Sequence, residues 1–314
     1  MKLSILIVAY NHEKYIEQAV RSALMQRTNF DFEIVVGEDC SPDSTASILR
    51  RLEQEHPDRL RVLYAEKNLG MMANYDRTFA ACRGQYVAML EGDDYWTSPH
   101  KLQRQVDFLD EHPECILCFH DVVVFVEGVP QDHAYRPPQK PITGLEDILE
   151  DIYINTGSVV LRHNVAPRLP DWARDLIIGD WPLFIHLAEY GKFGYIQEVM
   201  AAYRKHAVGA WQRASVHEQI DAVWKMYDRF NEHLKYKYDT QIQVLKRRWA
   251  AQIPLVAATI EWMHKAQAAG GEVERLQMSR RALKKECKAM SQELALLRQQ
   301  LNATSVAEPT RPSA

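Results

Sequence analysis

Short apolar runs alternate with longer amphipathic segments along the first half of the chain. The apolar runs at 3–9, 32–36, 60–65 and 86–90 predict buried strands, because each is short and is bounded by polar or turn-forming residues. The segments between them, at 13–26, 41–55 and 71–82, predict helices, the second starting with Ser41 as its N-cap and Pro42 in its first turn. This alternation is typical of βαβ units, which form a mainly parallel sheet covered by helices.

The pattern is less regular after Pro137 and Pro138. It predicts helices near 145–152 and 181–190 and strands at 158–161 and 199–203. Beyond Gly209 the pattern is helical, with helices predicted at 216–235 and 240–268. We expect the aromatic residues of these two helices in the core, because they recur at helical spacing; they are Trp224, Tyr227, Phe230, Trp249 and Trp262.

A heptad pattern of apolar residues runs from 272 to 301, with steps of four, three, four, three and four between Leu283 and Leu301. A seam of this length is typical of a coiled coil. The positions between the seam residues are basic. Three hypotheses stay open for this segment: formation of a homo-oligomer, packing against the rest of the chain, and peripheral binding to an anionic membrane.

Polar side chains follow each of the four predicted strands of the first half. They are Tyr10 and Asn11, Glu38 and Asp39, Lys67 and Asn68, and the sequence Glu91-Gly92-Asp93-Asp94. The carboxyl ends of parallel strands meet at one edge of a sheet, which is where open α/β sheets bind their ligands. We therefore expect these residues to form one site.

The three carboxylates of Glu91, Asp93 and Asp94 allow two interpretations. They form either a solvated acidic turn or a site for Mg²⁺ or Mn²⁺ shared with a phosphate, since both ions prefer oxygen ligands. The chain has no G-x-G-x-x-G after its first strand, no G-x-x-x-x-G-K-[ST] and no G-x-S-x-G. These absences argue against a dinucleotide-dependent dehydrogenase, a P-loop NTPase and an α/β-hydrolase.

Composition and charge narrow the class of protein. The chain is 46% hydrophobic and 25% charged, with a net charge of −4, which is ordinary for a globular protein and argues against nucleic-acid binding. Residues 1–210 nevertheless carry ten more acidic than basic side chains, and the remainder six more basic than acidic. We therefore expect the two parts of the chain to bind different partners.

The cysteines and apolar runs suggest a location. Five scattered cysteines form no disulfide framework and indicate a reducing compartment. Cys115 and Cys118 have C-x-x-C spacing, but in the strand that their neighbours predict they would point to opposite faces. No run reaches the roughly 20 apolar residues of a membrane span, and the run at 3–9 is too short for a signal peptide. We expect a cytoplasmic protein or one peripheral to the inner face of the cytoplasmic membrane.

A set of motifs resembles those of family 2 glycosyltransferases with the GT-A fold. They occur in that family's order and cover about two thirds of the chain, and they are most similar to the branch that assembles bacterial polysaccharides and O-antigens. The motifs are SILIVAYN at 4–11, FEIVVGEDCSPDST at 32–45, NLG at 68–70, GQYVAMLEGDDYW at 84–96, INTGSVVLR at 154–162 and GDWPLFIHLAEYGKFGYIQEVMAAYRKH at 179–206.

The resemblance implies roles for individual residues on the donor side. Asp39 would bind the base of a nucleotide-sugar, in a pocket lined by Val8 and Tyr10. The same nucleotide-sugar site would include Glu38, Lys67 and Asn68.

The resemblance also implies which residues bind the metal and the diphosphate and which residue acts as the general base. Asp93 would bind the ribose or a divalent metal, and Asp94 would be the principal ligand of Mn²⁺ or Mg²⁺ on the diphosphate. Asp180 would be the general base, although the residue before Trp181-Pro182 is by itself more typical of a helix N-cap. His206, with Tyr203 and Arg204, would lie near the diphosphate or close the site.

Three positions depart from the common family pattern. Glu91 stands where Asp is usual, Cys40 where Gly is common, and Val8-Ala9 where Pro-Thr is frequent. Because Glu91 is one methylene longer than Asp, direct contact between its carboxylate and the metal is in doubt.

The resemblance predicts an α/β protein with the GT-A architecture, in which helices flank a mixed, mainly parallel sheet. It predicts a catalytic domain at 1–210, with a nucleotide-sugar half at 1–98 and an acceptor half at 99–210. The periodicity and composition of the remainder predict a helical extension at 211–270, a coiled coil at 271–302 and a disordered tail at 303–314.

The implied activity is an inverting, metal-dependent transfer of a sugar. The donor would be a nucleotide-sugar, preferentially a UDP-sugar, and the acceptor a hydroxyl of a glycan or lipid-linked glycan in cell-surface polysaccharide synthesis. Two alternatives stay open: a nucleotidyltransferase of similar fold, and a non-catalytic nucleotide-sugar-binding scaffold that uses the coiled coil.

Overall fold

A computed structural model describes residues 1–126, 129–134, 138–165, 170–174, 176–205 and 214–249. The chain divides into two compact units, 1–250 and 251–314. The predicted coiled coil at 271–302, the tail at 303–314, Trp262 and His206 lie outside the described residues.

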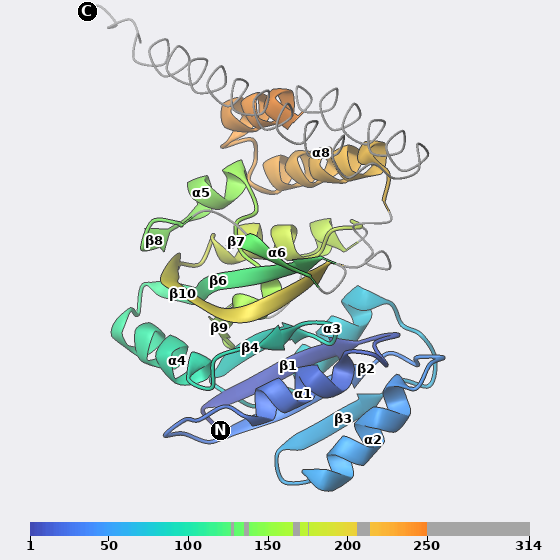
Figure 1. The fold of residues 1–314 in the computed structure, drawn as a ribbon. Coiled ribbons are helices and arrows are strands. Elements are labelled where there is room, and N and C mark those ends of the chain that lie inside the picture. Colours follow the sequence, from blue (N-terminus) through green and yellow to red (C-terminus); the bar gives the residue numbers. More distant parts are fainter. Residues whose placement is uncertain (127–128, 135–137, 166–169, 175, 206–213, 250–314) are drawn as a thin grey trace, which may run out of the picture. The chain divides into compact units, whose positions relative to one another are not determined.

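The centre of the first unit is one mixed sheet with the strand order β3-β2-β1-β4-β9-β6-β10-β5 (Figure 1). Strands β1 (Leu3–Ala9), β2 (Phe32–Glu38), β3 (Leu60–Tyr64) and β4 (Tyr86–Glu91) pair in parallel. The short strand β9 (Val160–Arg162) runs antiparallel between β4 and β6 and joins this half to the second.

The second half of the sheet is built on two long strands. β6 (Cys115–Val126) and β10 (Lys192–Lys205) are parallel to each other. Three shorter strands pair with them in antiparallel fashion: β5 (Tyr95–Trp96), β7 (Val129–Ala134) and β8 (Ile142–Thr143). The predicted mixed, mainly parallel sheet is thus confirmed.

Helices cover both faces of the sheet, and each face has its own hydrophobic core. Alternate residues of β1 face opposite cores, because successive side chains of a strand point to opposite sides. On one face lie α1 (Ile16–Leu24), α2 (Thr45–Glu55) and α4 (Lys101–Glu111). On the other lie α3 (Met71–Ala81), α5 (Leu145–Glu150), α6 (Asp180–Leu187) and α8 (Val216–His233). Two short 3-10 helices, η1 (Thr156–Ser158) and η2 (Asp171–Ala173), and a further helix that starts at 239 and reaches the end of the described segment at 249 are also present.

The start of α2 differs from the prediction. The helix begins at Thr45, and Ser41 does not cap it. Instead the Ser41 hydroxyl accepts a hydrogen bond from the Asn11 backbone N–H at 3.1 Å. The residues directly after β2 therefore form a loop that is hydrogen-bonded to the loop after β1, and the helix begins further along the chain.

The predicted orientation of Cys115 and Cys118 was wrong. A break in the register of β6 against β10 between Cys115 and Leu117 interrupts the alternation of sides, and both cysteines lie in the same core. Burial raises the pKa of the Cys115 thiol to about 11 and that of Cys118 to about 12. Both side chains are therefore neutral thiols at physiological pH.

Helix α8 belongs to the core of the first unit. Ser215 and Glu218 form a capping box at its start. Tyr227 and Phe230 are fully buried against residues of α5 and α6, and the Tyr227 hydroxyl donates to the Leu149 carbonyl at 2.7 Å. The core position predicted for these two aromatic residues is confirmed, and helical residues 216–233 share a core with the sheet.

Replacing Phe230 with alanine tests this packing. We expect Phe230→Ala to lower the free energy of unfolding by about 3–5 kcal/mol, because it removes a fully buried ring and leaves a cavity. The exposed Lys225 lies on the same helix, and Lys225→Ala should change stability by less than about 0.5 kcal/mol. Chemical denaturation of the full chain measures both values, and equal losses would contradict the assignment of α8 to the core.

Candidate active site

The carboxyl ends of β1, β2 and β4 meet at one edge of the sheet. Val8 of β1 lies between Gly37 of β2 and Glu91 of β4 in the strand register. The Gly92 N–H then donates to the Val8 carbonyl at 2.9 Å, so the loop after β4 stays against the end of β1. The structure thereby brings together the acidic residues at 91–94 and the residues after β1.

Gly92 is required for this close approach. A Cβ at this position would lie 2.6 Å from His12 Nδ1 and 2.9 Å from the Val8 carbonyl oxygen. Neither distance is compatible with a side chain. The absence of one at residue 92 therefore places Asp93 close to His12, whose Nε2 lies 3.8 Å from Asp93 Oδ2.

Arg204, from the end of β10, holds the acidic loop from the other side. Its guanidinium donates to the Asp93 carbonyl and to Gln18 of α1. The same group lies over the rings of Tyr95 and Tyr15, with 4.4 Å and 5.2 Å from Arg204 Cζ to the ring centroids. The two rings restrict the guanidinium, so a fixed positive charge lies beside the carboxylates.

Asp93 and Asp94 differ in accessibility. The side chain of Asp93 is 20% exposed, whereas Asp94 is only 3% exposed. Asp94 Oδ1 accepts a hydrogen bond from the Arg204 backbone N–H at 2.7 Å. Burial raises the pKa of Asp94 well above its usual range, and the charges of Asp93 and Glu91 add to the effect.

Glu91 connects the acidic loop to Asp180. Burial raises the pKa of Glu91 to about 8, and the negative charges of Asp93 and Asp180 contribute to this rise. Glu91 Oε2 has no hydrogen-bond partner within the described part of the chain. The negative charge of Asp180, distant in sequence, therefore acts on Glu91 at the end of β4.

Asp180 is the first residue of α6, and Gly179 is the N-cap. Its Oδ1 accepts a hydrogen bond from the Trp181 backbone N–H at 2.8 Å, and burial raises its pKa. A Cβ at Gly179 would lie 2.1 Å from the terminal methyl of Met72. The start of α3 therefore packs directly against the segment that carries Asp180.

The predicted residues at the end of β2 form hydrogen bonds to nearby loop segments. The two oxygens of Glu38 accept hydrogen bonds from the backbone N–H groups of Cys40 and Ser41. This arrangement supports the left-handed conformation of Cys40 at φ 57°, which explains why glycine would also suit this position.

Asp39 is 2% exposed and holds the segment 68–70. Its Oδ1 accepts from the Leu69 N–H at 2.8 Å, and its Oδ2 accepts from the Gly70 N–H at 3.0 Å and from Asn68 Nδ2 at 3.1 Å. The structure thus brings Asp39 and Asn68 together. Tyr10 and Lys67 are exposed at the same edge of the sheet.

Sequence reasoning missed the contribution of His12 and of the segment around η1. His12 follows β1 directly, so an aromatic nitrogen after the first strand was the available signal. A Cβ at Gly157 of η1 would lie 3.9 Å from Asp94 Oδ2, and no sequence signal pointed to this contact.

Comparisons with known proteins agree with this architecture. The sequence profile described as "Glycosyl transferase family 2" matches residues 4–166. An uncharacterised protein of Mycobacterium tuberculosis is 37% identical over 213 residues, which are 68% of this chain and 61% of that protein. TuaG of Bacillus subtilis, whose name assigns it to teichuronic acid biosynthesis as a glycosyltransferase, is 30% identical over 160 residues, 51% of this chain and 61% of TuaG. The chain thus spans about 61% of the length of these relatives.

A solved structure shares the fold. Residues 1–349 of Staphylococcus aureus TarS, in complex with UDP-GlcNAc, superpose with a TM-score of 0.57 and 20% identity. The match covers 74% of this chain and 67% of the TarS chain. It supports the GT-A arrangement of sheet and helices.

The raised pKa values of the site carboxyls predict the pH dependence of stability. Between about pH 4.5 and 8 the folded chain keeps a proton on Glu91 that the unfolded chain releases, so stability falls as pH rises through this range. The fall approaches about 1.4 kcal/mol per pH unit for one proton. Glu91→Gln should make it smaller, whereas Glu111→Gln, at an exposed position, should not. Thermal unfolding across this pH range measures the slopes, and parallel slopes for Glu91→Gln and the unmodified chain would contradict the prediction.

Proposed function

The chain belongs to glycosyl transferase family 2, and we propose that it transfers a sugar from a nucleotide-sugar to a hydroxyl group of a glycan or lipid-linked glycan. The observation that carries this proposal is that the charge of Asp180, at the start of α6, acts on Glu91 at the end of β4. It supports Asp180 as a candidate base beside a candidate metal and diphosphate site. The name of TuaG supports a role in cell-surface polysaccharide synthesis.

For the donor, we propose that the base lies at the ends of β1 and β2. Val8 and Tyr10 border this region, and Asp39 holds the segment 68–70 beside it. Both oxygens of Asp39 already accept hydrogen bonds. We therefore propose that its main role is to keep this segment in place. Asn68 and the neighbouring Glu38 share this role. Lys67 is exposed and supplies positive charge for the nucleotide-sugar.

A divalent cation fits the residues after β4. Their carboxylate oxygens are hard donors, and Glu91 Oε2 is buried without a partner among the described residues. Such a cation, Mn²⁺ or Mg²⁺, stabilises the negative charge that develops on a departing nucleoside diphosphate. We propose Asp93 as the direct ligand, because its side chain is the more exposed one. Asp94, which the resemblance made the principal ligand, would then fix the loop through Arg204.

Arg204 contributes a second positive charge at this edge of the site. Its guanidinium is restricted between two tyrosine rings and contacts the Asp93 backbone. We propose that this group faces the diphosphate. His206, two residues further and outside the described residues, stays in our proposal for the same role.

Asp180 is the proposed general base. An acceptor hydroxyl is a weak nucleophile until its proton is removed during attack, and burial makes the Asp180 carboxylate more basic than an exposed one. The hydroxyl oxygen forms a bond to the anomeric carbon while the bond to the diphosphate oxygen breaks on the opposite side. The proton passes to Asp180, and the anomeric configuration inverts.

The location and the partners beyond the donor belong to the same proposal. Within the described residues no helix combines the length and apolar character needed to span a bilayer. We propose a cytoplasmic enzyme whose basic C-terminal part forms a homo-oligomer or contacts the membrane that carries the acceptor.

Replacing Asp180 separates catalysis from donor binding. A thermal-shift panel of UDP-, GDP- and dTDP-sugars with Mn²⁺ and Mg²⁺ first identifies the donor, because a ligand of the folded state raises its apparent stability. Asp180→Asn should keep this shift but lower kcat for sugar transfer by about 10²–10⁴-fold. The matched control is Asp107→Asn, on the exposed side of α4, which should retain activity. Full activity of Asp180→Asn would refute its role, and a donor-induced shift without any sugar transfer by the unmodified chain would favour a scaffold without catalysis.

A second pair of variants tests the metal ligand. We expect Asp93→Asn to raise the Mn²⁺ concentration needed for half-maximal activity by more than about 10-fold, since it replaces the accessible carboxylate. Asp94→Asn should mainly lower thermal stability, because it weakens the bond to the Arg204 N–H. Metal titrations of activity and melting curves distinguish the two. The opposite pattern would restore Asp94 as the principal ligand.

A further inference from the structure

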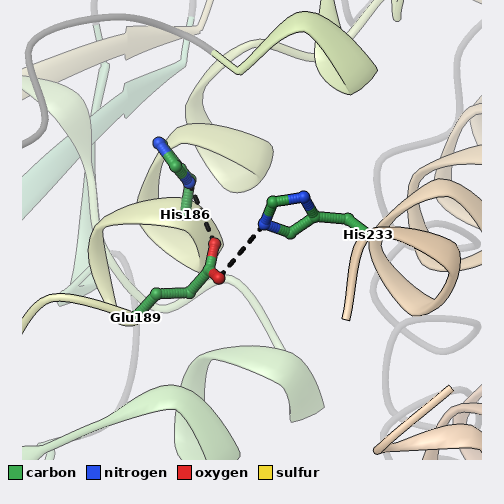
Figure 2. Close-up of side chains that lie close together, drawn as sticks. All are labelled: His186, Glu189 and His233. Atoms are coloured by element: carbon green, nitrogen blue, oxygen red, sulfur yellow. Dashed lines mark hydrogen bonds and ion pairs between the residues drawn. The ribbon is translucent and has the colours of Figure 1, made fainter. Parts of the chain in front are cut away.

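Two histidines and a glutamate point toward one another at the ends of α6 and α8 (Figure 2). His186 lies in the last turn of α6, Glu189 follows that helix, and His233 is the last residue of α8. Within the described part of the chain, this is the one group of three His, Cys, Asp or Glu residues whose ligand atoms all lie within 4.8 Å of one another.

We propose that His186, Glu189 and His233 form a binding site for a zinc ion. His186 Nδ1 lies 2.9 Å from Glu189 Oε1, and His233 Nε2 lies 3.2 Å from Glu189 Oε2. Two ligands of a tetrahedral zinc ion lie about 3.4 Å apart, given metal–ligand bonds near 2.0–2.1 Å. All three ligand atoms lie within 4.8 Å of one another, so their spacing approaches what one ion requires.

The chemistry of the three donors suits zinc better than magnesium. Imidazole nitrogen is a preferred ligand of zinc, whereas magnesium prefers oxygen ligands in an octahedral arrangement. Glu189 adds a carboxylate oxygen to the two imidazole nitrogens, and zinc accepts both kinds of ligand.

Packing restricts the two imidazoles before any ion binds. The ring of His186 meets that of Tyr190 edge to face with centroids 5.2 Å apart, and His233 lies beside Trp172 and Phe230 at 6.2 Å and 6.4 Å. Restricted rings lose little conformational freedom on binding, which favours affinity.

The fourth position of the zinc ion is open to water. The His233 side chain is 38% exposed, compared with 13% for His186 and 19% for Glu189. His233 also borders a cleft of about 710 Å³, lined by Pro170, Asp171, Trp172, Arg229 and Glu232. Three protein ligands and one water complete a tetrahedral site.

A zinc ion at this point would join two segments that are far apart in sequence. Glu189 and His233 are 44 residues apart, and α6 carries Asp180 of the candidate active site at its other end. The ion would therefore stabilise the packing of α8 on the catalytic core.

The test uses variants that keep the hydrogen bonds but remove the nitrogen ligands. In His186→Asn and His233→Gln, the side-chain amide can still donate to Glu189 from near the position of the original ring nitrogen, so folding is preserved. The matched control is His112→Asn, because His112 Nδ1 contacts Glu114 at 3.1 Å in a pair with no third ligand. The full chain is stripped with a chelator and then titrated with Zn²⁺ in excess Mg²⁺, which occupies the carboxylate site after β4.

We expect the unmodified chain and His112→Asn each to bind one more equivalent of Zn²⁺ per chain than the double variant His186→Asn/His233→Gln. We also expect zinc to raise the thermal stability of these two proteins. Each single variant should weaken zinc binding by more than about 10-fold. Co²⁺ in place of Zn²⁺ should give visible absorption bands that the double variant lacks. Equal zinc stoichiometry and equal stabilisation of the unmodified chain and the double variant would overturn the proposal and leave a hydrogen-bonded cluster only.

Discussion

The confinement of several carboxyl groups in a small, largely buried space is the constraint on which the candidate site depends. Asp94 is buried, Glu91 and Asp180 are partly buried, and the pKa values of all three carboxyls are raised, while Asp93 adds further negative charge beside them. Such an arrangement costs folding free energy, because charged groups lose hydration and repel one another. It persists because the two hydrophobic cores, one on each face of the sheet, hold the strand ends in place.

The structure limits this cost with a few specific contacts. Gly92 lets the acidic loop lie directly against the end of β1. Arg204 supplies a positive charge whose position is set by two tyrosine rings and by the Asp93 carbonyl. A cation at the same place, as proposed above, would relieve the remaining repulsion.

Loop segments after the strands are fixed by polar side chains in a similar way. The loop after β1 is joined to the loop after β2, since the N–H groups of Asn11 and His12 donate to the hydroxyls of Ser41 and Thr45. Asp39 in turn fixes the segment 68–70. These bonds arrange the surface where the base of a donor would lie before any ligand is bound, which reduces the entropy lost on binding.

The sequence by itself determined the order of strands and helices from β1 to β4, the parallel half of the sheet, and the gathering of polar residues at its carboxyl edge. These features follow from periodicity, and periodicity is a local property that the chain displays directly. It also predicted the buried positions of Tyr227 and Phe230. It did not predict α4 or the short strands β5, β7 and β8. Only the tertiary structure decided that Ser41 bonds to a neighbouring loop, that a register break places Cys115 and Cys118 in one core, and that Asp93 is more accessible than Asp94. Each of these depends on which distant backbone atom or side chain lies opposite, and sequence spacing does not contain that information.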